Sequence, residues 1–286
     1  MSTSYLPSYL ERLNAFPENF ACFIPRLPGI EVSTDREAVI AALTPEHEAI
    51  MRKHGIEPRF LRRAQQVHGN RVALVGDIGC SYPVEGVDGL FCGGVADCCL
   101  GIYVADCAAV WVYDTVSGAR GLVHSGKMGT AQNIVGELFE RMRKTLGVKA
   151  ADCIAVISPC IRKPDYEVDI AEDIKAQLAA AGLKQENIID SGLNTAADLD
   201  TFTHTELKKA IPAGCWRSSA DCPAPMPIIA TREPGRSKAT AAGRSSRAVA
   251  QAAGKLCAGM LGRAAPHAGR RAARRPAHMP LRAATA

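Results

Sequence analysis

Three residues with metal-binding side chains stand where expected strands meet loops. His68 precedes the strand-like run 71–75, Cys107 lies between two apolar runs, and His124 ends the run 121–124. One thiolate and two imidazoles form a three-ligand site with a free fourth position, which is typical of catalytic zinc. An ion held in this way lowers the pKa of bound water to about 7 and so supplies a nucleophile at neutral pH. Spacing alone leaves simpler interpretations open: a polar histidine at a strand end and a small buried cysteine.

The loop that follows His124 has the residues of an anion site. It reads HSGKMGT, with Lys127 and Gly129 placed before a helix expected to begin at Thr130. Backbone N–H groups, the helix dipole and a lysine together attract negative charge. A plain helix N-cap at Thr130 explains the same residues without any ligand.

The first 210 residues, which must position these side chains, have the pattern of one α/β domain. Apolar spacing predicts a helix over 36–53, continuous or broken at Pro45. It also predicts helices over 130–146 and 170–181, which end at Gly147 and Gly182. Runs typical of strands cover 71–75, 100–104, 110–113, 121–124 and 153–157. The order of these elements predicts a three-layer α/β/α fold with a mixed sheet.

The composition changes after residue 210. Residues 211–286 contain 21 Ala, 11 Arg and a single aromatic residue, with a net charge of +11, whereas residues 1–210 carry −6. Such a tail buries too little apolar surface to offset its ordering entropy, so we expect it to be disordered or out of frame. It has no aromatic stacking platform and no recognisable nucleic-acid module, so we expect no nucleic-acid partner.

Membrane and secreted classes are not expected for this chain. No apolar run reaches the ~18 residues of a membrane span, and the start, MSTSYLPSYLERLNAF, does not have the pattern of a signal peptide. Eleven cysteines in such a chain indicate reduced thiols rather than a disulfide framework. The expected location is therefore the cytoplasm.

Five motifs in order give the chain a family resemblance. They are QQVHGNRV at 65–72, GVDGL at 86–90, GIYVADCAAV at 101–110, GLVHSGKMGT at 121–130 and SPCIRKPDYEV at 158–168. Together they resemble the multicopper polyphenol oxidase or laccase-domain family, which is also described as purine nucleoside phosphorylases. The resemblance implies that His68, Cys107 and His124 bind a zinc or copper ion and take part in catalysis. FIPR at 23–26 resembles a further family segment, which places Arg26 near the site.

The resemblance also implies an enzyme and its substrates. The expected reactions are phosphorolysis of adenosine, inosine and methylthioadenosine, and deamination of adenosine, with Arg26 and Lys127 helping to hold phosphate. A copper-dependent polyphenol oxidase and an inactive remnant are the alternatives. Where the family has HAGWRG this chain has HSGKMG, so Lys127 and Met128 replace a Trp-Arg pair and the substrate range is open.

The resemblance stops just before the composition changes. The codons of AIPAGCWR at 210–217, read two bases later, can encode Asp-Ser-Gly-Arg-Met-Leu-Ala, which resembles the missing family ending. We infer a frameshift just before Ala210, with a genuine basic extension as the alternative. The lost ending would supply a terminal strand, so we expect an exposed sheet edge and a poorly stable or weakly active protein.

Overall fold

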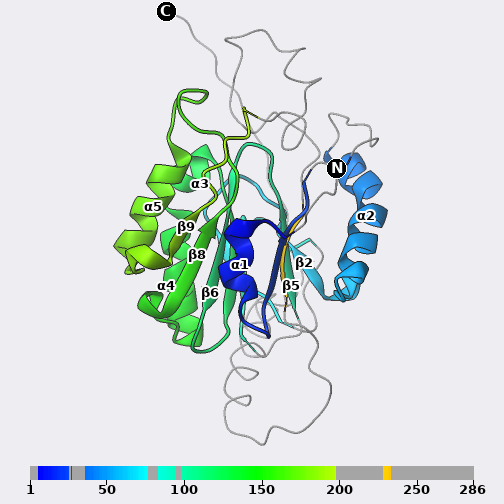
Figure 1. Ribbon diagram of the computed structural model, residues 1–286, viewed down its shortest axis with the longest axis horizontal. Helices are drawn as coiled ribbons and strands as arrows, with labels where there is room; N and C mark the ends of the chain where they lie inside the picture. The colour runs from blue at the N-terminus through cyan, green and yellow to red at the C-terminus, as the bar shows by residue number, and fades with distance from the viewer. Residues whose placement is uncertain are drawn as a thin grey trace, which may run out of the picture.

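The computed structural model describes residues 6–25, 27, 36–76, 83–94, 98–197 and 228–232. Two β-sheets pack face to face, and helices cover the outer face of each (Figure 1). Helices α3, α4 and α5 lie on one side and α2 lies on the other. The helix bounds are α1 Glu11–Asn14, α2 Arg36–Lys53, α3 Lys127–Ala131, α4 Ile134–Leu146 and α5 Ile170–Ala181. Four short 3₁₀ turns cover Ser8–Leu10, Pro58–Phe60, Ala150–Asp152 and Gln185–Asn187.

Both sheets combine parallel and antiparallel pairs. The larger sheet has the order β3 (Val72–Leu74), β4 (Gly89–Cys92), β7 (Arg120–Ser125), β6 (Ala108–Asp114), β8 (Cys153–Ile157) and β9 (Ile188–Asp190). The smaller sheet has the order β1 (Phe20–Phe23), β10 (Ile228–Arg232), β5 (Cys99–Tyr103) and β2 (Leu61–Arg63). The pairs β3–β4, β8–β9 and β2–β5 are parallel and the others are antiparallel. The expected α/β class with mixed strand pairing is confirmed.

The alternation of apolar side chains explains why the sheets stack in this way. In β6, Val110 and Val112 belong to the core under α4 and α5, whereas Trp111 and Tyr113 belong to the core between the two sheets. Successive residues of a strand point to opposite faces, so a strand that is apolar on both sides needs a layer on each. In this fold the second layer over β6 is the smaller sheet rather than a layer of helices, so the fold has four layers where three were expected.

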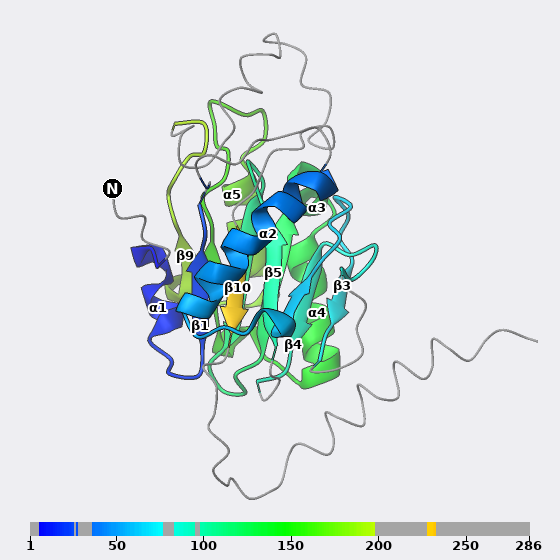
Figure 2. The same ribbon diagram turned by 90° about the vertical axis from the view of Figure 1, so that its right-hand side faces the viewer.

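Helix α2 covers the outer face of the smaller sheet, as Figure 2 shows. Its residues Val39, Leu43 and Met51 pack with Tyr103 of β5 in a third apolar cluster. Pro45 lies inside this one continuous helix, so the alternative of two short helices is wrong. Packing on the sheet holds the helix together although Pro45 has no N–H group to donate.

The expected helix over 130–146 is two helices in the structure. Asn133 has a left-handed backbone, with φ 57°, and its side chain accepts a hydrogen bond from the Gly136 N–H group. This cap separates α3 from α4, and Gly147 ends α4 in the left-handed conformation, as its position predicted. The loop after His124 therefore leads into a five-residue helix that begins at Lys127 rather than at Thr130.

The strand β10 comes from the Ala- and Arg-rich tail, where no element was expected. Its backbone pairs antiparallel with β1 on one side and with β5 on the other, for example Ala230 with Cys22 and with Gly101. A composition argument misses such a strand because backbone pairing requires no aromatic side chain. The other residues of 211–286, and the proposed frameshift point, lie outside the described residues.

Within the described ranges, no helix combines the length and the apolar character that crossing a membrane requires.

Candidate metal centre

The three candidate ligands come from different loops and strands and meet at one point. His68 lies in the loop between β2 and β3, Cys107 lies directly before β6, and His124 belongs to β7. Their ligand atoms, two imidazole nitrogens and the Cys107 Sγ, all lie within 4.8 Å of one another. The rings of His68 and His124 have centroids 4.9 Å apart and are nearly perpendicular. The structure thus brings together the three residues that the sequence singled out.

The register of β6 and β7 explains how Cys107 reaches His124. Ala109 pairs with His124, so Cys107 lies opposite the residue that follows Ser125, which is Gly126. A Cβ atom on Gly126 would lie 2.5 Å from Cys107 Sγ and 3.8 Å from His124 Nε2. A side chain at this position would displace a ligand atom, so the glycine is a steric requirement of the site.

Asp88, which the sequence analysis did not single out, fixes two of the three candidate ligands. Its carboxylate is fully buried and accepts a hydrogen bond from His124 Nδ1 at 2.9 Å. It also accepts from the backbone N–H groups of Val67, His68 and Gly69 at 3.1, 2.8 and 2.8 Å. These bonds hold the His68 loop, whose φ is 60° at His68 itself. The only sequence signal was an aspartate inside the glycine-bearing motif GVDGL.

The charges of the site favour deprotonation of the thiol. Burial raises the pKa of Cys107, but the charge of His124 and hydrogen bonds with His124 and His68 outweigh it, so the pKa falls below its ordinary value. Burial disfavours imidazolium at His124, yet Cys107 and the Asp88 carboxylate raise the pKa of His124. Asp88 is also buried, but its hydrogen bonds with His124 and Gly69 hold its pKa below the usual range. The thiolate, which is the form that binds a metal, is therefore accessible near neutral pH.

These residues fit a zinc or copper ion in their chemistry. The Asp88 carboxylate engages Nδ1 of His124, so Nε2 is the nitrogen that faces Cys107 Sγ. A carboxylate on the remote nitrogen of a histidine is the usual support of a metal ligand, because it fixes the tautomer and the ring. A thiolate with two imidazoles also suits both metals.

Lys127 lies at the rim of this group and already has a partner. Its Nζ forms an ion pair with the Glu167 carboxylate, and both side chains are exposed. Burial raises the pKa of Tyr166, Lys127 opposes the rise, and the charge of Cys107 adds to it, so the phenol lies near both groups. Arg26, the other expected phosphate ligand, lies outside the described residues.

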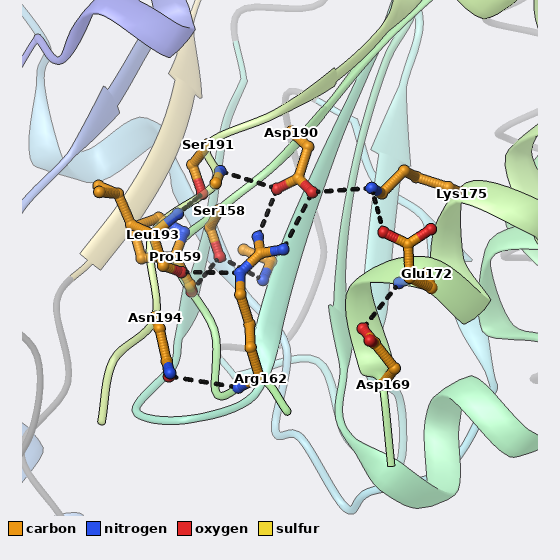
Figure 3. Close-up of polar contacts among 12 residues, drawn as sticks. Ser158, Pro159, Arg162, Asp169, Glu172, Lys175, Asp190, Ser191, Leu193 and Asn194 are labelled. Carbon is orange, nitrogen blue, oxygen red and sulfur yellow. Dashed lines mark hydrogen bonds and ion pairs between the residues drawn. The ribbon is translucent and has the colours of Figure 1, made fainter. Parts of the chain in front are cut away.

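The loop that carries Tyr166 and Glu167 is held in place by Arg162. The Arg162 guanidinium faces both oxygens of Asp190, at 3.0 Å for Nη1, and Lys175 lies on the other side of Asp190 at 3.2 Å (Figure 3).

The start of this loop is joined to the turn that bears Cys107. The Ile161 N–H group donates to the backbone oxygen of Asp106 at 2.8 Å, and the Thr195 hydroxyl bonds to the Asp106 carboxylate at 2.7 Å. The rim of the site is therefore fixed relative to the candidate ligands.

A cysteine and two histidines at strand ends, with a carboxylate behind one imidazole, define a candidate metal centre on a mixed α/β scaffold. The chain belongs to the multi-copper polyphenol oxidoreductase laccase family, whose model matches residues 29–210. The family resemblance of the five motifs is thereby confirmed. The match ends where the composition changes.

Several curated relatives are named purine nucleoside phosphorylases. The protein from Streptomyces coelicolor is 30% identical over 189 residues, which cover 63% of this chain and 75% of that protein. The protein from Bacteroides thetaiotaomicron is 36% identical over 110 residues, which cover 36% of this chain and 40% of that protein. The chain thus spans well under two thirds of some of these relatives.

Solved structures share the fold. YlmD from Geobacillus stearothermophilus matches with a TM-score of 0.60 at 20% identity, covering 76% of this chain and 92% of that one. The YfiH protein of Bacillus licheniformis matches with a TM-score of 0.57 at 19% identity, covering 74% and 91%.

Proposed function

We propose that this chain is a metal-dependent purine nucleoside phosphorylase that also deaminates adenosine. The proposed nucleosides are adenosine, inosine and methylthioadenosine. The observation that carries the proposal is the convergence of His68, Cys107 and His124 with Asp88 behind them. The names of the Streptomyces and Bacteroides relatives support the nucleoside substrate.

In this proposal His68, Cys107 and His124 hold a zinc or copper ion. Such an ion supplies Lewis-acid chemistry at the substrate. Asp88 keeps the proton of His124 on Nδ1 and fixes the His68 loop through three backbone N–H groups. Cys107 contributes a thiolate because its pKa is lowered.

The rim residues are proposed to handle phosphate. In phosphorolysis a phosphate oxygen bonds to the anomeric carbon, the bond to the purine nitrogen breaks, and the purine takes up a proton. Lys127 would attract the phosphate dianion, with Arg26 as the second cation. Exposed ion pairs contribute little net free energy, so phosphate can displace Glu167 from Lys127. The Tyr166 phenol, whose pKa is raised by burial, is protonated at neutral pH and can donate a hydrogen bond.

Deamination is the second proposed reaction at the same residues. Water adds to the purine carbon that bears the amino group, and ammonia leaves, which converts adenosine to inosine. Both proposed reactions place a purine beside His124 and Cys107, so the same residues can serve both.

A copper-dependent polyphenol oxidase is the second candidate, because the family description names that chemistry. Reduction of oxygen to water takes four electrons, which laccases distribute over several copper ions. Among the described residues, one His/Cys group with ligand spacing is present. We therefore rank purine chemistry first.

One incubation separates these functions. The full chain, loaded with zinc or with copper, is mixed with adenosine and phosphate, and the products are resolved by chromatography. Ribose 1-phosphate supports phosphorolysis, and inosine without ribose 1-phosphate supports deamination alone. Neither product there, with oxidation of a phenol in a parallel incubation under air, would contradict the proposal, and no product in either incubation would support an inactive remnant. His54→Ala, at the residue that directly follows α2, is the matched control for His68→Ala.

A further inference from the structure

A cavity of about 500 Å³ lies on the outer face of the smaller sheet, which is the face that α2 covers, between α2 and the strands β2 and β5. Figure 2 shows α2 crossing this sheet. Residues of α2, of the turn Pro58–Phe60, of β2 and of β5 line the cavity, and the candidate metal ligands are not among these lining residues. Cavities of this volume commonly bind small molecules.

A buried histidine without a protein partner lines this cavity. His47 is 1% exposed, and neither of its ring nitrogens has a hydrogen-bond partner among the described residues. Its ring lies 5.9 Å from that of Tyr103, between centroids. Burial and the charge of Arg63 lower the pKa of His47 to about 4, so the ring is neutral at pH 7, with one donor and one acceptor nitrogen. Buried polar groups in native proteins nearly always have partners, so a bound molecule would complete this one.

Arginine side chains contribute to the lining of the cavity. Arg63 is 7% exposed, and its guanidinium lies over the Tyr103 ring, 5.3 Å from the centroid. Arg59 also lines the cavity, together with the carboxylate of Glu57. Guanidinium groups match phosphate oxygens in geometry and charge.

The remaining lining sets the size and the polarity of the occupant. Arg52 and Glu48 form an ion pair at 2.7 Å and neutralise each other. Outside this pair, the lining includes the cations Arg59 and Arg63 and the carboxylate of Glu57. Met51, Leu61 and Tyr103 add apolar surface that inorganic phosphate would not cover.

We propose that this cavity is a second binding site and that it takes a phosphate monoester of small-molecule size. The phosphate group lies against Arg59 and Arg63. The organic part lies against Tyr103, and His47 completes a hydrogen bond with it. This site is separate from the proposed catalytic residues, so the inference does not depend on the proposed function.

Calorimetric titration of the full, metal-loaded chain tests the site with three esters: AMP, ribose 5-phosphate and phenyl phosphate. We expect at least one ester to bind, and Arg59→Ala to raise its Kd at least tenfold. Arg59 is exposed, so this substitution leaves the core intact. Arg143→Ala, on the exposed face of α4, should leave the Kd unchanged. The kcat/KM for adenosine should be the same in both variants.

Failure of all three esters to bind, or an equal Kd in Arg59→Ala and the parent chain, would overturn the proposal. A further outcome is that inorganic phosphate binds as tightly as the esters and loses the same affinity in Arg59→Ala. That result would show a plain anion site and would also contradict the proposal. His47→Phe provides a second readout. This variant should lose the rise in Tm that the bound ester causes, and a retained rise would count against the role of His47.

Discussion

Two buried histidines of this protein have opposite surroundings. His124 is 4% exposed and lies between the Asp88 carboxylate and the Cys107 thiol, which raise its pKa. His47 is 1% exposed, has no hydrogen-bond partner among the described residues and lies near Arg63, and its pKa is lowered. Burial alone lowers the pKa of both rings, so the neighbours decide the outcome. The neighbours of His124 favour a cation at its ring, either a proton or a metal ion, whereas the neighbours of His47 keep its ring neutral.

Removal of His124 should have the largest effect. His124→Ala deletes a candidate metal ligand and leaves the Asp88 carboxylate buried beside an empty space. We expect kcat/KM for adenosine phosphorolysis to fall by at least about 1,000-fold, because a Lewis acid contributes several kcal/mol of transition-state stabilisation. Steady-state kinetics measure the loss. His54→Ala should keep full activity, and an active His124→Ala would remove the basis of the comparison.

The lowered pKa of His47 should make the folded chain less stable in acid. The pKa of His47 is about 4 in the folded chain and about 6.5 when unfolded, so the unfolded chain binds this proton first. The folded chain is therefore more stable above pH 6.5, where His47 is neutral in both states, than below pH 4, where it is protonated in both. The free energy of unfolding falls by about 3 kcal/mol between these limits. Urea unfolding at several pH values should therefore show less acid destabilisation in His47→Phe than in the parent chain. Parallel curves would contradict the account of His47.

Asp88→Asn tests whether the carboxylate behind His124 is what separates the two histidines. An amide of the same shape presents an N–H donor to a group of donors, so the His68 loop and the His124 tautomer lose their support. We expect metal affinity to fall by about 10–100-fold, with kcat/KM falling alongside. Competition with a chelator gives the affinity. Asp165→Asn, on the exposed loop after β8, is a matched control, and equal behaviour of the two variants would mean that Asp88 has no positioning role.

The smallest effects should come from the exposed rim. Lys127→Ala should raise the KM for phosphate by about tenfold and leave kcat nearly unchanged, because it removes a binding charge. Glu167→Gln should lower the same KM a few-fold by releasing Lys127 from its ion pair. Initial rates at varied phosphate measure both. An unchanged KM in both variants would assign phosphate binding to other residues.

Much of the scaffold follows from local patterns. The strands around Val112 and Val156 and the helix ending at Gly147 are predicted because apolar runs and glycine stops are local signals. The division into two sheets is not predicted, since a strand apolar on both faces, such as β6, has the same sequence in either arrangement. The break at Asn133 depends on one residue with a positive φ.

The candidate site was also predictable only where the signal is local in the sequence. His68, Cys107 and His124 were identified from their residue types and motifs. Asp88 was missed because its role consists of bonds to residues 19 to 36 positions away. The ion pair of Lys127 with Glu167 spans 40 positions, and no local pattern predicts it.

The metal content of the purified full chain tests the central claim most directly. Elemental analysis should find about one zinc or copper ion per chain, and far less in His68→Ala, Cys107→Ala and His124→Ala, with His54→Ala unchanged. The same metal content in the three ligand variants as in the parent chain would show that these side chains do not share an ion.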